Sequence, residues 1–180
     1  VLPERLAVKS WGRKYADTLF DSDVLIVGGG GIAQEIARLL TPFRAKVSVV
    51  RKNLAPIENV DRVLALADLP TALKSADFVF VASALTGETR RLFDADMIQN
   101  MKRTAYLINI ARGAIVVSKD LEDALRSGAI AGAGIDVTDP EPLPDEHSLW
   151  MCPNLIITPH TADTPEMCLR LLSDRIVANV

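Results

Sequence analysis

The sequence has few of the residues that build disulfide or metal scaffolds. Its 180 residues include only two cysteines, Cys152 and Cys168, and two histidines. The cysteines form no CxxC pair and no cluster with the histidines, which excludes a disulfide scaffold and argues against a structural zinc site. We therefore expect no metal.

Aromatic residues make up only 5% of the chain, and no apolar run is long enough to cross a bilayer. No signal-peptide pattern opens the sequence, so we expect a cytoplasmic protein without a membrane partner. Lysine and arginine number 20 against 23 acidic residues, and the net charge is −3. Because no basic block is present, we expect no binding to nucleic acid.

The composition is that of an ordinary globular domain, with 49% apolar and 24% charged residues. We expect residues 1–180 to form one domain, since this length buries a substantial core. The chain opens on valine rather than methionine. It ends within a helical pattern in which Leu169, Leu172, Ile176 and Val180 share one face without a following cap. These features predict a fragment of a longer protein.

Strand-like and helix-like patterns alternate along the chain. Short apolar runs predict strands at 24–27, 47–50, 60–66, 78–81, 106–109, 130–136 and 155–158. The apolar residues in these runs do not alternate with polar ones, which is typical of strands buried on both faces. Buried strands separated by helices predict an α/β fold, a Rossmann-type doubly wound parallel sheet in three α/β/α layers.

Helix ends are marked by residues that satisfy the terminal backbone groups. Asp68, Asp94 and Ser118 are predicted N-caps, and the last two open helices that reach Met101 and Arg126. Gly128 lies where a left-handed C-cap is expected. The proline-rich, acidic stretch 138–154 is the one long irregular segment, and long loops of this kind are often functional.

A glycine-rich turn follows the first predicted strand directly. Its letters G-G-G-G-I-A fit the pattern G-x-G-x-x-A, with Gly28 making the tight turn and Gly30 admitting a pyrophosphate. Gly31 and Ile32 begin the next helix, whose N–H groups would bind the phosphates, and Ala33 supplies the small residue needed for helix–strand packing. The pattern predicts a dinucleotide site. The alternative is a flexible glycine linker.

The second strand ends in Arg51 and Lys52 rather than in an acid. Arg51 follows Gly28 by 23 residues, close to the spacing of about 20 at which NAD-binding folds place Asp or Glu on the adenosine ribose. An arginine cannot accept hydrogen bonds from ribose hydroxyls, but it suits a 2′-phosphate. We therefore predict NADPH over NADH, with NAD possible. The alternative is a solvated basic pair.

Three polar segments follow later strands, at the edge where open α/β sheets bind ligands. They are N-I-A-R-G at 109–113, D-V-T-D-P-E-P at 136–142 and T-P-H at 158–160. With the L-T-G-E-T-R segment at 85–90, these motifs resemble, in order, those of the D-isomer-specific 2-hydroxyacid dehydrogenases. The resemblance covers nearly the whole chain and implies hydride transfer between NAD(P)H and a small 2-oxo or 2-hydroxy acid.

The resemblance also implies a role for each motif residue. Arg112 would anchor the substrate carboxylate, which a guanidinium fork can hold through two hydrogen bonds. His160 would be the general acid and base, and Glu141 would favour its protonated form. Asp136 would lie at the nicotinamide end of the cofactor. Three further residues would line the cofactor site: Ala84, Leu85 and Ala111.

In the resembled family this domain is inserted into a split substrate domain and forms homodimers. Both parts of the substrate domain are expected to be missing here, and a homodimer is expected. The substrate type is left open between phosphoglycerate dehydrogenase and glyoxylate/hydroxypyruvate reductase. Because the family includes corepressors, a non-catalytic, dinucleotide-sensing interaction protein is the alternative. His147 is predicted to be a surface residue, and Trp150 is expected to lie beneath the acidic loop.

Overall fold

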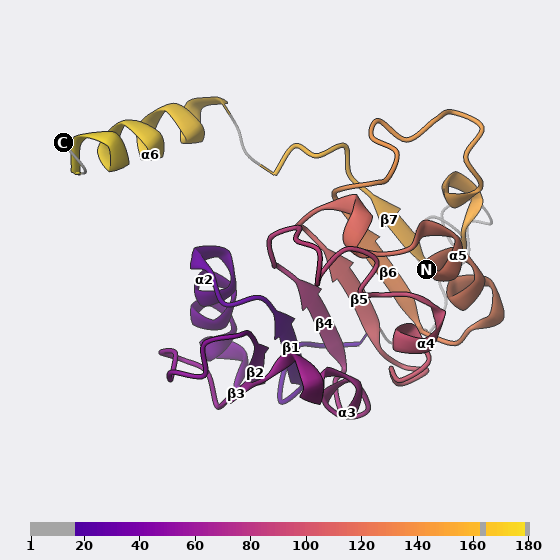
Figure 1. Cartoon of the computed structure of the whole chain (residues 1–180), viewed down its shortest axis with the longest axis horizontal. Coiled ribbons are helices and arrows are strands. Elements are labelled where there is room, and N and C mark those ends of the chain that lie inside the picture. Colours follow the sequence, from indigo (N-terminus) through magenta and orange to yellow (C-terminus); the bar gives the residue numbers. More distant parts are fainter. Residues whose placement is uncertain (1–16, 163–164, 179–180) are drawn as a thin grey trace, which may run out of the picture.

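The computed structural model describes residues 17–162 and 165–178 of the chain. Within these ranges, seven parallel strands form one sheet in the order β3-β2-β1-β4-β5-β6-β7 (Figure 1). The strands are β1 (Asp23–Val27), β2 (Lys46–Val50), β3 (Arg62–Leu64), β4 (Phe78–Val81), β5 (Tyr106–Asn109), β6 (Gly132–Ile135) and β7 (Leu155–Ile157). Because β1 lies between β2 and β4, the strand order reverses there, which confirms the doubly wound, Rossmann-type fold.

Helices connect the strands and follow the last one. They are α2 (Gly31–Leu40), α3 (Leu69–Leu73), α4 (Ala95–Ile98), α5 (Ser118–Ser127) and α6 (Pro165–Ala178). Figure 1 shows α6 apart from the sheet, and its Leu169 and Ile176 side chains are exposed. The predicted C-terminal helix is thus present, whereas Val180 lies outside the described residues. None of the described helices has the length and apolarity that a membrane span requires.

Alternate residues of β1 pack on opposite faces of the sheet. Val24 and Ile26 belong to a core with the buried side of α2, whereas Leu25 and Val27 belong to a core with α3, α4 and α5. All four side chains are at most 2% exposed. Burying such a side chain contributes about 1.5–3 kcal/mol, so helices on both faces are held by β1. This packing makes the three layers.

Two of the predicted caps are confirmed. The Asp94 carboxylate accepts a hydrogen bond from the backbone N–H of Met97 at 2.9 Å, and Gly128 has the left-handed φ of +67°. The element bounds are shorter than predicted, because α4 ends at Ile98 and β6 begins only at Gly132. The bounds of β6 follow its backbone pairing with β5 and β7, which an apolar run does not specify.

The prediction that Ser118 is an N-cap is wrong. Ser118 is the first residue of α5, and Val117 precedes the helix without a side-chain capping bond. The Ser118 hydroxyl instead donates to the backbone carbonyl of Asp139 at 3.2 Å. This hydrogen bond joins the loop at Asp139 to the start of α5, so Ser118 contacts a distant segment instead of capping its own helix.

Asp68 lies at the predicted N-cap position of α3, with a proline in the first turn, but its side chain makes no capping bond to this helix. Its carboxylate accepts a hydrogen bond from the backbone N–H of Ala65 at 3.1 Å, within the short 3-10 turn Leu66–Asp68. Asp68 therefore acts at the start of that preceding turn.

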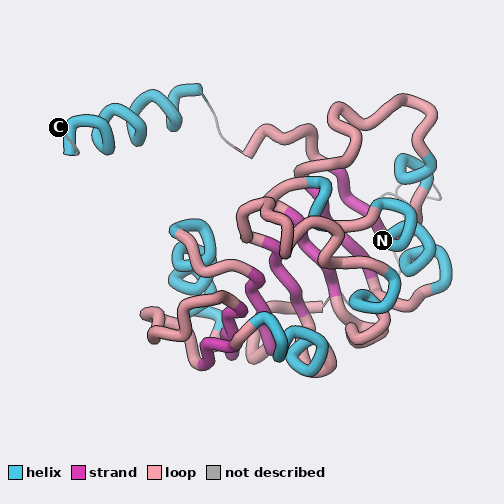
Figure 2. The backbone as a smooth tube through the Cα atoms, in the orientation of Figure 1, coloured by secondary structure: helices cyan, strands magenta, loops and turns pink. Residues whose placement is uncertain are grey.

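Figure 2 shows the connection between β6 and β7 as a long loop with one short helical turn, Ser148–Met151. His147, predicted to be a surface residue, is partly exposed, and its Nδ1 accepts a hydrogen bond from the Leu149 N–H at 3.2 Å and caps this turn. The Trp150 indole donates to the Pro144 carbonyl at 2.9 Å, but it is 49% exposed rather than beneath the loop.

A buried carboxylate ties this loop to α5. Glu122 is 8% exposed, and it accepts hydrogen bonds from Arg126 Nε at 2.9 Å and from Ser148 Oγ at 2.5 Å. The bonds from Ser148 and Arg126 lower the pKa of Glu122. The ionised carboxylate therefore stabilises the attachment of the loop that carries Glu141.

Replacing Glu122 with alanine should lower the free energy of unfolding by about 1–3 kcal/mol, because Ser148 and Arg126 lose a charged partner. The carboxylate contribution is complete above the ordinary glutamate pKa of 4.5 and is lost as the pH falls through the lowered folded-state value. Urea unfolding of the wild type and Glu122→Gln should therefore converge below that pH. An unchanged unfolding free energy in Glu122→Ala would contradict this role.

Candidate active site

The glycine turn begins where β1 ends and requires glycine at its first position. Gly28 has a φ of +119°, and a Cβ atom there would lie 2.4 Å from the carbonyl oxygen of Ala82. The Gly28 N–H donates to the Val50 carbonyl at 2.9 Å. The turn is thus held between the carboxyl ends of β2 and β4.

The start of α2 is open to a ligand. A Cβ atom at Gly30 or Gly31 would meet no atom within 4 Å. Among the described residues, no side chain caps this helix end and no acid lies in its first turn. Its N–H groups therefore point at space in which a phosphate would be stabilised. Ala33 is 1% exposed, consistent with the close helix–strand packing predicted for it.

Arg51 and Lys52 lie beside the glycine turn. The Arg51 methylene stem passes so close to Gly29 that a Cβ atom there would lie 2.3 Å from Arg51 Cδ. The Arg51 guanidinium donates to the Ala55 carbonyl at 2.5 Å, and its buried Nε has no hydrogen-bond partner in the described part of the chain. The Lys52 ammonium pairs with Glu88 at 2.7 Å.

A cavity of about 410 Å³ opens next to the start of α2. Its lining brings together the predicted Ile32, Ala84, Leu85, Ala111 and Arg112. Arg112 Nη1 donates to the Ala111 carbonyl at 2.6 Å. The lining also includes Ser83, whose Oγ is buried and lacks a hydrogen-bond partner among the described residues. An unpaired hydroxyl in a cavity wall is a group that a polar ligand would satisfy.

A second cavity, of about 350 Å³, contains the predicted acid and base. His160 Nδ1 lies 2.5 Å from Glu141 Oε1, and Asp136 is in the same lining. Both partners of the pair are about two-fifths exposed, at 45% for the His160 side chain and 40% for Glu141. His160 has a left-handed φ of +53°, which is uncommon for a residue with a side chain.

The charges around Glu141 keep it ionised. Its hydrogen bond with His160 is the largest cause that lowers its pKa, and the Arg112 guanidinium also lowers it. Arg112 lines one cavity and His160 the other, yet Arg112 acts electrostatically on Glu141. Arg112, Glu141 and His160 therefore interact electrostatically at the carboxyl edge of the sheet.

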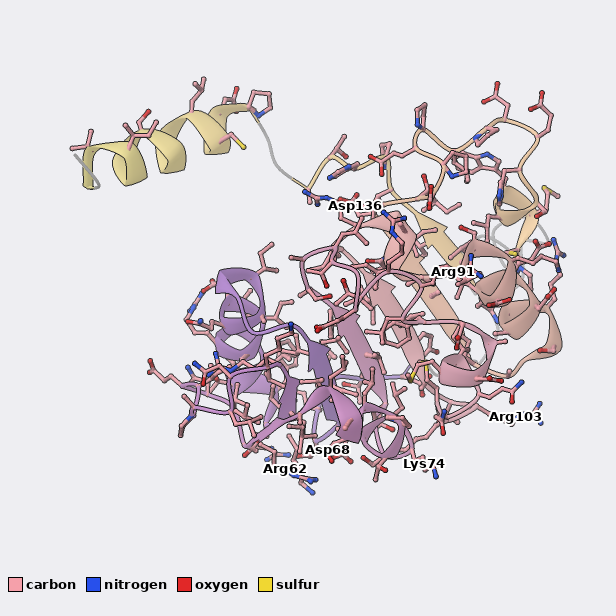
Figure 3. The ribbon with its side chains drawn as sticks, viewed as in Figure 1. Arg62, Asp68, Lys74, Arg91, Arg103 and Asp136 are labelled. Atoms are coloured by element: carbon pink, nitrogen blue, oxygen red, sulfur yellow. The ribbon has the colours of Figure 1, made fainter. Side chains whose placement is uncertain are left out.

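Asp136 is held at the carboxyl end of β6, as Figure 3 shows. It is 8% exposed, and its carboxylate accepts a hydrogen bond from Thr158 Oγ1 at 2.5 Å. The backbone of Thr158 donates to Ile135, which fixes the threonine in register with β6. Thr158 was not among the predicted site residues, although it belongs to the T-P-H motif.

The glycine of the N-I-A-R-G motif is a second residue that sequence reasoning did not single out. A Cβ atom at Gly113 would lie 1.9 Å from the Thr138 carbonyl oxygen. Only glycine lets the two loops approach this closely, and they carry Arg112 and Glu141. The motif spacing marked this glycine, but its partner loop lies too far along the chain to be deduced locally.

The described residues contain no group of three or more His, Cys, Asp or Glu side chains that could hold a metal ion.

Comparison with protein families gives a match over residues 4–162 to the family model described as D-isomer specific 2-hydroxyacid dehydrogenase, NAD binding domain. The chain belongs to this family. The match spans the glycine turn and all four motifs that follow it.

Individual relatives agree with the family. Over 143 residues the chain is 43% identical to the glyoxylate reductase/hydroxypyruvate reductase of Homo sapiens, covering 79% of this chain and 44% of that protein. A D-isomer specific 2-hydroxyacid dehydrogenase from Xanthobacter autotrophicus Py2, solved with NADPH and MES, superposes with a TM-score of 0.85 at 31% identity, covering 99% of this chain and 76% of that chain.

A second solved structure is the NADPH-dependent glyoxylate/hydroxypyruvate reductase of Sinorhizobium meliloti in complex with NADP and sulfate. It has a TM-score of 0.86 at 29% identity and covers 98% of this chain and 58% of that chain. The present chain spans about half the length of the curated relatives it matches.

Proposed function

We propose that this domain binds NADP(H) along the carboxyl edge of the sheet and contributes Arg112, Glu141 and His160 to the reversible reduction of a small 2-oxo acid. The observation that carries the proposal is the His160–Glu141 pair, with 2.5 Å between Nδ1 and Oε1, in the cavity that also contains Asp136. An imidazole paired with an ionised carboxylate is a group suited to exchanging a proton with a reacting oxygen.

The residues at the edge fit a dinucleotide. The open backbone at Gly30, Gly31 and Ile32 would bind the pyrophosphate, because the N–H groups of α2 face space there. The adenosine end would lie by Arg51 and Lys52. The nicotinamide end, which supplies or accepts the hydride, would lie against the remaining predicted residues: Ala84, Leu85, Ala111 and Asp136.

His160 would handle the proton of the substrate oxygen. During reduction the carbonyl oxygen gains negative charge, and a protonated His160 would donate to it from Nε2 while Nδ1 stays bonded to Glu141. During oxidation the neutral imidazole would take the hydroxyl proton back. The ionised Glu141 fixes the ring orientation and stabilises the imidazolium in both directions.

Arg112 would hold the substrate carboxylate. Its guanidinium presents a planar fork of donors that matches a carboxylate, and it lines the cavity beside Ser83. The names of the relatives point to small substrates such as glyoxylate and hydroxypyruvate. A phosphoglycerate dehydrogenase is also among the structural neighbours, so the substrate class is a short 2-oxo or 2-hydroxy acid.

We further propose that the domain acts together with a substrate domain, in a cytoplasmic homodimer. The greater length of the curated relatives supports a second domain. The charged groups Arg112 and His160 would then face that domain across a closed cleft, from which water is excluded during hydride transfer.

Arg51 should favour NADPH over NADH, because its buried Nε has no hydrogen-bond partner among the described residues and its guanidinium suits a 2′-phosphate. The structural neighbours solved with NADPH or NADP include those from Xanthobacter autotrophicus Py2 and Sinorhizobium meliloti. Arg51→Asp should shift the preference toward NADH by about 1–3 kcal/mol, the scale of a charge-assisted hydrogen bond. Calorimetric titration of both cofactors into both proteins measures this shift. Tighter binding of NADH than of NADPH by the wild type would contradict the preference.

A further inference from the structure

Glu88 lies on a loop that its own hydrogen bonds hold in place. The Thr86 N–H donates to Thr89 Oγ1 at 2.8 Å, and the Thr89 hydroxyl donates to the Ala84 carbonyl at 2.7 Å. The Thr89 N–H also donates to Thr86 Oγ1 at 3.3 Å. These bonds fix the start of the loop that follows β4, and they place Glu88 between the two threonines in a defined position.

From this position Glu88 reaches the loop that follows β2. Its Oε2 lies 2.7 Å from the Lys52 ammonium, and both side chains are more than half exposed. In the sheet, β1 lies between β2 and β4, so the ion pair connects the two loops that flank the glycine turn. A ligand on that turn would lie next to this pair.

Lys52 is therefore already neutralised before a ligand arrives. The neighbouring Arg51 donates to a neutral carbonyl, that of Ala55, and forms no ion pair within the described residues. We propose that Glu88 is a specificity-determining residue that competes with the 2′-phosphate of NADPH for Lys52. This inference rests on the proposed binding of a dinucleotide at the glycine turn.

The competition acts on one cofactor only. A phosphate monoester carries about −1.5 to −2 charges at neutral pH, so it must draw Lys52 away from Glu88 and approach a carboxylate of the same sign. NADH has no 2′-phosphate, so its binding would leave the Lys52–Glu88 ion pair intact. Because exposed ion pairs contribute up to about 1 kcal/mol, the effect on NADPH affinity should be up to about fivefold and should weaken in high salt.

The test is titration calorimetry of the wild-type chain and Glu88→Gln with NADPH and with NADH, in about 20 mM and about 500 mM salt. The matched control is Asp123→Asn, which removes the acid of another exposed ion pair, with Lys119 on α5. Glu88→Gln should bind NADPH about three- to fivefold more tightly in low salt, with NADH affinity unchanged and the gain reduced in high salt. Asp123→Asn should leave both affinities unchanged.

An equal change for both cofactors, no change, or weaker NADPH binding by Glu88→Gln would overturn the inference and leave dinucleotide binding itself standing. The same gain in Asp123→Asn would also overturn it, because the effect would then report only net charge. Lys52→Gln gives a second check, since it should weaken NADPH but not NADH. If the wild type bound neither dinucleotide, the proposed function would fail, and the inference with it.

Discussion

Replacing His160 with glutamine should lower the turnover of 2-oxo acids by about 10²- to 10⁴-fold, while dinucleotide affinity stays nearly unchanged. Glutamine keeps a polar side chain but cannot deliver a proton to the developing oxyanion. The rate should be measured by steady-state kinetics on the chain joined to the proposed substrate domain, beside an NADPH titration. His147→Gln is the matched control, because that histidine caps a helical turn and does not line the cavity.

Equal losses in His160→Gln and His147→Gln would show that the first substitution acts through the fold. Full activity of His160→Gln would show that His160 is not the general acid and base. Cofactor binding without turnover by the wild-type two-domain protein would favour the alternative of a dinucleotide-sensing interaction protein of the corepressor type.

The His160–Glu141 pair predicts a change in the pH profile of reduction. Reduction needs the protonated imidazole, and the ionised carboxylate beside it favours that form. The lowered pKa of Glu141 keeps this carboxylate charged to more acidic pH than an ordinary glutamate. In Glu141→Gln the charge is gone at every pH, so the rate of reduction should be lower and should no longer depend on the ionisation of this side chain at acidic pH. A profile identical to the wild type would count against the pairing.

The 180-residue chain by itself should bind NADP(H) yet reduce glyoxylate or hydroxypyruvate at a negligible rate. The glycine turn, Arg51 and Asp136 that would hold the cofactor are all present. Without the proposed substrate domain, however, Arg112 alone would hold the substrate and water would enter the site, so both orientation and desolvation would be lost.

Two assays on one preparation decide this: cofactor titration followed by intrinsic fluorescence, and NADPH consumption with each 2-oxo acid. The control is the same preparation of Gly28→Val, which should lose binding because a side chain there meets the Ala82 carbonyl. Robust turnover by the chain alone would mean that the substrate site is misplaced.

The fold could be predicted from the sequence because its signals are local. The apolar runs at 24–27 and 78–81 become β1 and β4, and both lie within a sheet that is parallel throughout. The glycine turn was predictable for the same reason, since the φ of Gly28 and the helix start at Gly31 are encoded within a few residues. The right-handed crossover rule then left few other topologies.

The contacts near the site that sequence reasoning missed join distant segments of the chain. The sequence predicts Ser118 to be an N-cap, but its hydroxyl donates a hydrogen bond to the carbonyl of Asp139 in the loop instead. The pairing of Lys52 with Glu88 joins two loops that are neighbours only because β1 lies between their strands. The motifs therefore predicted which residues gather at the carboxyl edge, but not which side chains of that edge bond to one another.

The most direct test of the account is a map of backbone amide NMR shifts as NADPH is added to the isotope-labelled chain. We expect shifts along one path, from Arg51 through Gly30 and Ile32 to Ala111 and Asp136, with the opposite edge of the sheet unaffected. Shifts confined to that opposite edge, or no shifts at saturating NADPH, would contradict a dinucleotide site at the glycine turn.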